Sequence, residues 1–128
     1  GLERRLFDRG RVVTVLDGKA MRLGISKHLA HDAEGRAENL RRSAHFARFL
    51  NDSGVICCAS FVAPSNDSRD HAINVIGRGN CFVIYCNPPI EACIKRDPSG
   101  LYASSENGKT DNVPGLSFPY QKPREIHA

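Results

Sequence analysis

Three ionisable side chains follow the first strongly apolar segment of the chain. The run from Val12 to Leu16 leads directly into Asp17 and Gly18, and Lys19 and Arg22 come next. A buried strand that ends in a carboxylate is typical of the sheet edge where nucleotides and phosphates bind. Lysine is protonated at neutral pH unless it is strongly desolvated, so Lys19 can pair with a phosphate but cannot accept a proton. The turn therefore indicates recognition of an anion. Lys19 stands where a second carboxylate would be more useful as a base.

The segments that must position this turn alternate between strand-like and helix-like patterns. Continuous apolar runs favour buried strands, whereas apolar residues at three- and four-residue spacing favour amphipathic helices. Gly10 ends the first expected helix, and Asp32 is a plausible N-cap for the longest one. The expected strands cover residues 11–16, 55–61 and 81–86, and the expected helices cover residues 2–9, 20–29, 33–50, 68–76 and 88–95.

This order predicts an α/β fold, a three-layer parallel sheet with helices on both faces. Residues 1–128 form one domain, in which residues 1–96 are the α/β core. Residues 97–128, rich in Pro, Gly, Ser and Asn, are expected to be a mobile lid or disordered. Ligands bind at the C-terminal ends of parallel strands, so the polar turn at Asp17 is the first candidate site.

Composition narrows the choice of ligand and compartment. The formal charge of +4 suits an anionic ligand, but the sequence has neither a block of like charges nor interleaved aromatics, and no nucleic-acid partner is expected. The five cysteines match no zinc or Cys-x-x-Cys spacing, so we expect small buried hydrophobes and no metal site. No segment has the length of a signal peptide or a membrane span, and a cytoplasmic protein without a membrane partner is predicted.

Five fragments, in order and in register, resemble the adenylylsulfate kinase family. They are LDG at 16–18 with Arg22 and Gly24, RAENLRR at 36–42, FVAP at 61–64, RDPSGLY at 96–102 and PY at 119–120. The resemblance implies a P-loop kinase fold and transfer of the γ-phosphate of ATP to adenosine 5′-phosphosulfate. It also implies ATP and magnesium as cofactors.

The chain departs from the family pattern on the side that performs the transfer. The P-loop pattern G-x-x-x-x-G-K-[ST] occurs nowhere in the 128 residues, so the resemblance implies a fold without the first P-loop strand and the last strand. The family sequence D-G-D-N reads Asp17-Gly18-Lys19-Ala20 here. We expect ATP and magnesium to bind poorly, and these positions define no complete catalytic set. Asp17 remains a candidate, either as a magnesium ligand through water or as the cap of the turn.

The substrate side matches better. Arg22, Arg36 and Asn39 lie at the family positions that bind the acceptor nucleotide, and forked arginine donors suit a dianionic group. His31 stands where the family places an aromatic ring on the acceptor adenine. Arg96 and Pro98 match the family motif and are the expected cofactor-binding residues. Three other positions differ from the family: Val113 replaces a lid phenylalanine, and Asn66 and Ser99 each replace a cationic residue.

Three functional hypotheses follow. We favour a non-catalytic domain that binds adenosine 5′-phosphosulfate or 3′-phosphoadenosine 5′-phosphosulfate, because truncation would not alter internal positions such as Lys19. The alternatives are a fragment of an active kinase whose P-loop lies upstream, and a decayed domain that serves as an interaction surface. A sheet without its central strand has unpaired edges, so poor solubility or homo-oligomer formation is expected. The family resemblance adds a sulfate adenylyltransferase as a partner to consider.

Overall fold

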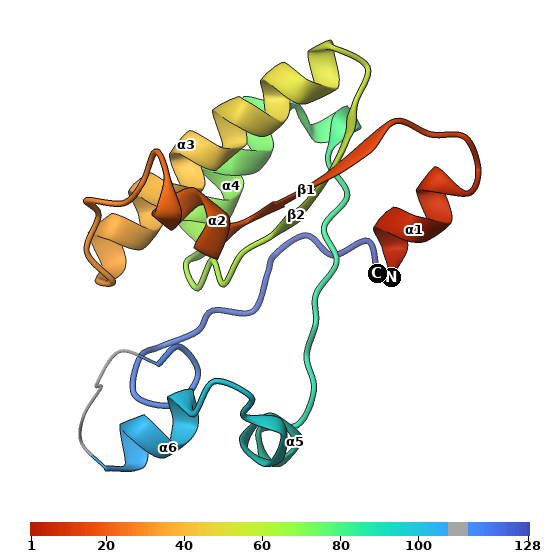
Figure 1. Cartoon of the computed structure of the whole chain (residues 1–128). Helices are drawn as coiled ribbons and strands as arrows, with labels where there is room; N and C mark the ends of the chain where they lie inside the picture. Colours follow the sequence, from red (N-terminus) through yellow and green to blue (C-terminus); the bar gives the residue numbers. More distant parts are fainter. Residues whose placement is uncertain (108–112) are drawn as a thin grey trace.

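A parallel pair of strands, flanked by helices, organises the chain (Figure 1). The computed structural model describes residues 1–107 and 113–128. Strands β1 (Val13–Asp17) and β2 (Ile56–Ser60) pair in register from Val13 opposite Ile56 to Asp17 opposite Ser60. Both strands therefore end at the same edge, and the predicted α/β architecture with parallel strands is confirmed. A parallel pair needs a long crossover connection, and the helices between β1 and β2 provide it.

Four of the five predicted helices are present with ends shifted by at most two residues, but the helix predicted over residues 20–29 covers only Gly18–Leu23, and residues 24–28 form turns. Asp32 caps the longest helix as predicted, because its Oδ1 accepts a hydrogen bond from the Gly35 N–H at 2.7 Å. Gly10 follows the first helix in a left-handed conformation, with φ of +71°. The helices are α1 (Leu2–Phe7), α2 (Gly18–Leu23), α3 (Ala33–Asp52), α4 (Asn66–Ile76), a 3₁₀ turn η1 (Arg78–Asn80), α5 (Ile90–Arg96) and α6 (Leu101–Glu106).

The core lies where α2 and α3 meet the two strands. Leu16, Met21 and Ala47 are its buried centre, and partly buried Cys57, Phe61 and Ile76 pack around them. Helices α3 and α4 run side by side along the sheet (Figure 1). The predicted apolar stripe of α3 is confirmed in part, since Ala44 and Ala47 are buried.

The prediction of a third buried strand over residues 81–86 is wrong for the structure. This segment is extended but has no strand neighbour, and Phe82 and Ile84 are 78% and 56% exposed. Its main chain pairs instead with the C-terminus, where His127 N–H donates to Val83 O and Tyr85 N–H to Ala128 O, each at 2.8 Å. An apolar run becomes a strand only when a neighbouring strand satisfies its main chain.

Two other predictions need correction. Strand β2 is not buried on both faces, because Ile56 at its start is exposed. The cysteines are free but not fully buried, with Cys86 exposed and the other four half-buried. Both differences have the same cause, since the described sheet has two strands and cannot enclose every apolar run.

The described part of the segment after residue 96 includes a short helix and a buried side chain. It contains α6, and Val113 is 2% exposed. Asp97 organises the start of α6, because its carboxylate accepts hydrogen bonds from the N–H groups of Leu101, Tyr102 and Ala103. In the part of the chain that the structure describes, no helix is both long and apolar enough to cross a membrane.

Candidate functional site

The turn that follows β1 lies against the end of β2 and the middle of α3. The Asp17 Oδ1 atom accepts a hydrogen bond from Ala20 N–H at 2.7 Å and begins α2. At Gly18 a Cβ atom would lie 3.3 Å from the ring of Phe61 and 3.6 Å from Nδ2 of Asn39. Of the two interpretations of Asp17, the structure shows the cap. Lys19, in the same turn, is exposed.

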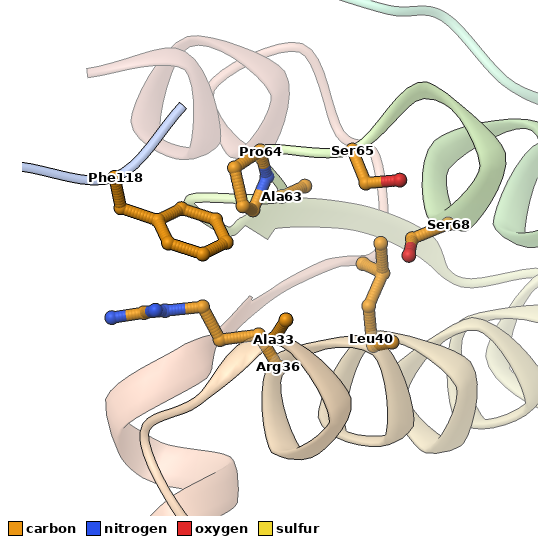
Figure 2. Close-up of a pocket in the computed structure, with 9 residues that line it drawn as sticks. Ala33, Arg36, Leu40, Ala63, Pro64, Ser65, Ser68 and Phe118 are labelled. Atoms are coloured by element: carbon orange, nitrogen blue, oxygen red, sulfur yellow. The ribbon is translucent and has the colours of Figure 1, made fainter. Parts of the chain in front are cut away.

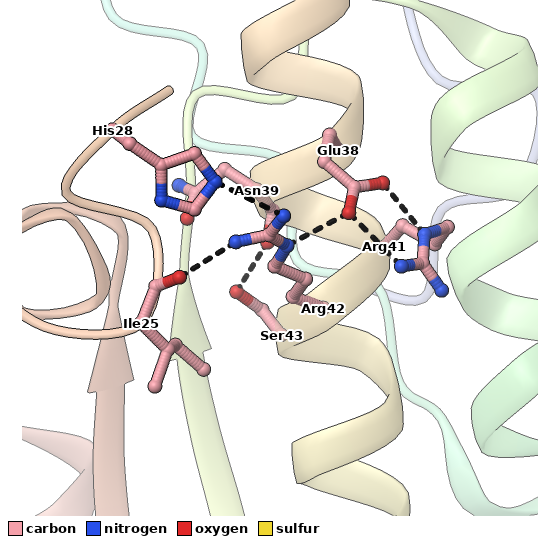
Figure 3. Close-up of polar contacts among 7 residues, drawn as sticks. All are labelled: Ile25, His28, Glu38, Asn39, Arg41, Arg42 and Ser43. Carbon is pink, nitrogen blue, oxygen red and sulfur yellow. Dashed lines mark hydrogen bonds and ion pairs between the residues drawn. The ribbon is translucent and has the colours of Figure 1, made fainter.

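Two arginines hold the segment between α2 and α3. Arg22 Nη1 donates to the carbonyls of Leu29 at 2.8 Å and Ala30 at 3.1 Å. Arg42, on α3, donates from Nη1 to the carbonyl of Ile25 at 2.6 Å (Figure 3). Several main-chain carbonyls of this loop are thereby satisfied by guanidinium groups, which fixes its path toward the start of α3.

Glu38 orients Arg42 from the same helix. Its carboxylate accepts hydrogen bonds from Arg41 Nε at 2.6 Å and from Arg42 Nε at 2.7 Å (Figure 3). The hydrogen bonds from Arg41 and then Arg42 lower the pKa of Glu38 from its usual 4.5 to about 2. His28 Nε2 lies 3.3 Å from Arg42 Nη2 at the other end of the network. This network was not predicted from the sequence, although the spacing of Glu38 and Arg42 is that of a helical i, i+4 pair.

Glycine at position 35 lets the loop approach the first turn of α3. A Cβ atom there would lie 2.1 Å from the carbonyl oxygen of Ala30, too close for any side chain. The Ala30 carbonyl also accepts the hydrogen bond from Arg22. The loop, Arg22 and the start of α3 are thus brought together at one point.

Arg22 and Arg36 lie close enough to repel each other. The pKa of Arg36 is lowered, first by burial and second by the charge of Arg22, while Asp32 opposes the shift. Arg36 is half-buried and extends along the wall of a small pocket. Two guanidinium groups in a partly desolvated position favour an anionic ligand, because a negative charge there would relieve their repulsion.

Asn39 contributes a buried acceptor beside the turn at Gly18. The residue is 4% exposed, and its Oδ1 has no hydrogen-bond partner. Asn39 lies three residues after Arg36, on the same face of α3. A buried polar atom without a partner is costly, so Oδ1 is available to a donor from a ligand.

The pocket beside Arg36 lies between the beginnings of α3 and α4 (Figure 2). Its volume is about 40 Å³. The ring of Phe118 covers it, and the guanidinium carbon of Arg36 lies 5.7 Å from the ring centroid. Phe118 was not predicted as a site residue, and the signal that could have indicated it is its place directly before the Pro119-Tyr120 motif.

The other predicted residues lie elsewhere. His31 is exposed just before the Asp32 cap. Arg96 ends α5 and Pro98 follows it, and in Figure 1 α5 lies apart from α2 and from the start of α3. Val113 is buried and presents no surface to a ligand. Residues 1–107 and 113–128 contain no group of three His, Cys, Asp or Glu side chains that could hold a metal ion.

Comparison with known proteins identifies relatives along nearly the whole chain. The family model described as adenylylsulphate kinase matches residues 1–127. The "Bifunctional enzyme CysN/CysC" of Rhodopirellula baltica is 45% identical over 122 residues, which are 95% of this chain and 19% of that protein. The adenylyl-sulfate kinase of Bacteroides thetaiotaomicron is 40% identical over 95% of this chain and 61% of its own length.

A solved structure shows the same fold. The Mycobacterium tuberculosis APS kinase CysC, in complex with AMPPNP and APS, superposes with a TM-score of 0.91 and 35% identity over 97% of this chain and 73% of that one. The chain spans only part of the relatives it matches: about three fifths of the length of the Bacteroides thetaiotaomicron protein and about one fifth of the bifunctional enzyme.

Proposed function

The chain belongs to the adenylylsulphate kinase family, a family of sulfate assimilation, and from this premise we propose that it binds adenosine 5′-phosphosulfate without phosphorylating it. The phosphosulfate contacts Arg22 and Arg36, and Asn39 accepts a hydrogen bond from the ligand. The related product 3′-phosphoadenosine 5′-phosphosulfate is a second ligand of the same class.

One observation carries the proposal, namely the approach of Arg22 and Arg36 at the start of α3. Arg22 is held there by the Leu29 and Ala30 carbonyls, and Arg36 lies one turn into α3. Burial and, after it, the charge of Arg22 lower the pKa of Arg36, so the two groups form a local excess of positive charge. A dianion offers each guanidinium a charge-assisted hydrogen bond, and such bonds are about twice as strong as neutral ones.

The residues of the turn after β1 support the proposal that this chain does not transfer phosphate. Lys19 and Ala20 occupy the positions where the family pattern has aspartate and asparagine, and Asp17 is engaged as a helix cap. Asn66, at a position where the family has a cation, accepts a hydrogen bond from Arg69 at 2.6 Å. Transfer depends on groups that stabilise developing negative charge and accept the proton of the acceptor hydroxyl. Neither Lys19 nor Ala20 has a carboxylate that could accept this proton.

The described residues do not fit the cofactors that the family implies. Asp17 alone, with one oxygen used for capping, is a poor magnesium site, and no cluster of three possible metal ligands accompanies it in residues 1–107 and 113–128. Arg96 is the last residue of α5, and α5 lies apart from α3 in Figure 1. We therefore derive no step that involves ATP or magnesium. Association with a sulfate adenylyltransferase stays a proposal, supported by the bifunctional relative.

Calorimetric titration with adenosine 5′-phosphosulfate and with ATP, beside a coupled assay for phosphate transfer, tests the proposal. We expect binding of the sulfonucleotide, no heat from ATP and no turnover. Arg36→Ala should weaken binding about 10- to 150-fold, the equivalent of a charged hydrogen bond of about 1.5–3 kcal/mol. Arg48→Ala is the matched control, because Arg48 lies on α3 but pairs with Asp52.

Each other outcome contradicts a stated part of the proposal. Turnover would show a kinase and overturn the non-catalytic assignment. If titration with adenosine 5′-phosphosulfate gives no binding heat, the proposal fails, and a domain that serves as an interaction surface is the remaining hypothesis. An equal loss of affinity in Arg36→Ala and Arg48→Ala would show a general charge effect rather than a site at Arg36.

A further inference from the structure

We propose that Phe118 is a specificity-determining residue of this site, because its ring stacks on the base of the nucleotide whose anionic group binds Arg36. This inference rests on the proposed function. The ring is half-exposed and lies over the Arg36 guanidinium, with the Ala63–Ser65 turn on the far side of the pocket (Figure 2). The pair thus offers a cation for the anion and a flat apolar face for a ring.

The position of the ring is set by the residues that follow it. Gln121 N–H donates to the Pro64 carbonyl at 2.9 Å, and Gln121 Oε1 accepts from Asn66 N–H at 2.7 Å. Three residues before this double anchor, Phe118 is carried onto the mouth of the pocket. The anchor joins the C-terminal segment directly to the beginning of α4.

Arg69 strengthens the anchor from below. It is buried, and its guanidinium donates to the carbonyls of Ala63 and Gln121. The same guanidinium lies 5.5 Å from the ring centroid of Tyr120, and the Tyr120 ring stacks with that of Tyr85, with centroids 6.1 Å apart and planes at 12°. Arg69 is therefore a positioning residue for the segment that bears Phe118.

The residues before Phe118 fix the ring from the other direction. The N–H groups of Ser117 and Phe118 both donate to the carbonyl of Val113 at 3.0 Å. Gly115 N–H donates back to the Phe118 carbonyl at 2.7 Å. Because Val113 is buried, it holds this turn in place, and the Phe118 side chain extends from the turn toward Arg36.

The size of the pocket decides how a base can use this ring. About 40 Å³ is room for roughly one water molecule, so a purine does not fit beneath the ring. A base can instead lie on the half-exposed ring, and aromatic side chains and guanidinium planes are the surfaces on which bases stack in proteins. Arg36 below the ring then lies within reach of the anionic group that the base carries.

The test compares two ligands on the 128-residue chain by calorimetry: adenosine 5′-phosphosulfate, and inorganic pyrophosphate, which has a similar anionic group and no base. Stacking on an aromatic side chain is worth about 1–3 kcal/mol, so Phe118→Leu should weaken the sulfonucleotide about 5- to 150-fold. Pyrophosphate affinity should stay within about twofold, since its contacts are electrostatic. Phe118→Tyr, which retains the π-face, should restore binding.

Phe49→Leu is the matched control, because Phe49 is an exposed ring on α3, 13 residues after Arg36. Circular dichroism melts of all variants verify that each is folded. If Phe118→Leu weakens both ligands equally, the ring only holds Arg36 in place and the inference is overturned; an unchanged sulfonucleotide affinity overturns it as well. If the unmodified chain binds neither ligand, the proposed function and this inference both fall.

Discussion

Arginine residues around the start of α3 have two distinct roles. Arg22 and Arg42 bind main-chain carbonyls of the loop between α2 and α3, at distances of 2.6–3.1 Å. Arg36 instead borders the pocket beneath Phe118. The family resemblance placed Arg22 and Arg36 in one group, and the structure adds that Arg22 also holds the loop carbonyls, whereas Arg36 lines the pocket. Substitution of Arg22 would therefore change the loop and the ligand site together.

Glu38 makes the stability of this arrangement dependent on pH. The pKa of Glu38 is about 2 in the folded chain and takes its usual value of 4.5 in the unfolded chain. The unfolded chain therefore takes up the proton first as pH falls. The stabilisation is present above about pH 4.5 and is lost as pH falls toward 2. We expect the difference in unfolding free energy between the unmodified chain and Glu38→Gln to shrink over this window in urea melts.

Glu34→Gln is the control for this measurement, since Glu34 lies on the same helix outside the Arg41–Arg42 network. A difference between the unmodified chain and Glu38→Gln that stays constant from pH 6 to pH 2.5 would contradict the role assigned to the Glu38 carboxylate.

Among the elements, the contact between the α2–α3 loop and the first turn of α3 is the most constrained. Gly35→Ala would place a methyl group against the Ala30 carbonyl, and the backbone must move to accommodate it. Overpacking of this kind costs about 1–3 kcal/mol, so we expect a lower melting temperature and weaker binding of adenosine 5′-phosphosulfate. Gly79→Ala, where nothing lies within 4 Å of the new Cβ, is the control. Equal melting temperatures for the two variants would show that the loop yields freely.

For the molecule as a whole, the described sheet leaves apolar side chains in solvent. Phe82, Ile84, Val62 and Ile56 are exposed, and both β1 and β2 have one edge without a strand neighbour in the described residues. Unpaired edges beside apolar surface promote association. We expect the 128-residue chain to self-associate at micromolar concentration in light-scattering measurements after size exclusion, and Phe82→Lys with Ile84→Lys to reduce this. A monomer that melts cooperatively would contradict the expectation.

Local signals in the sequence were sufficient for much of the fold. The Asp32 cap and the apolar stripe of α3, the run from Val12 to Leu16 with the Asp17 turn, and the Gly10 stop all depend on residues close together in the chain. Capping and periodicity act over a few residues, so a single sequence reveals them. The same holds for the family, whose fragments lie in register along the chain and whose model matches residues 1–127.

Contacts between distant residues needed the tertiary structure. Residues 81–86 have the composition of a strand, but strand formation depends on a neighbour, and the segment meets the C-terminus instead. Phe118 reaches Arg36 because Gln121 is anchored to Pro64 and Asn66, more than fifty residues earlier in the chain. The sequence by itself thus determined the family, the helices and the candidate arginines. Which side chains share a site was decided by long-range hydrogen bonds and packing, whose partners no local pattern specifies.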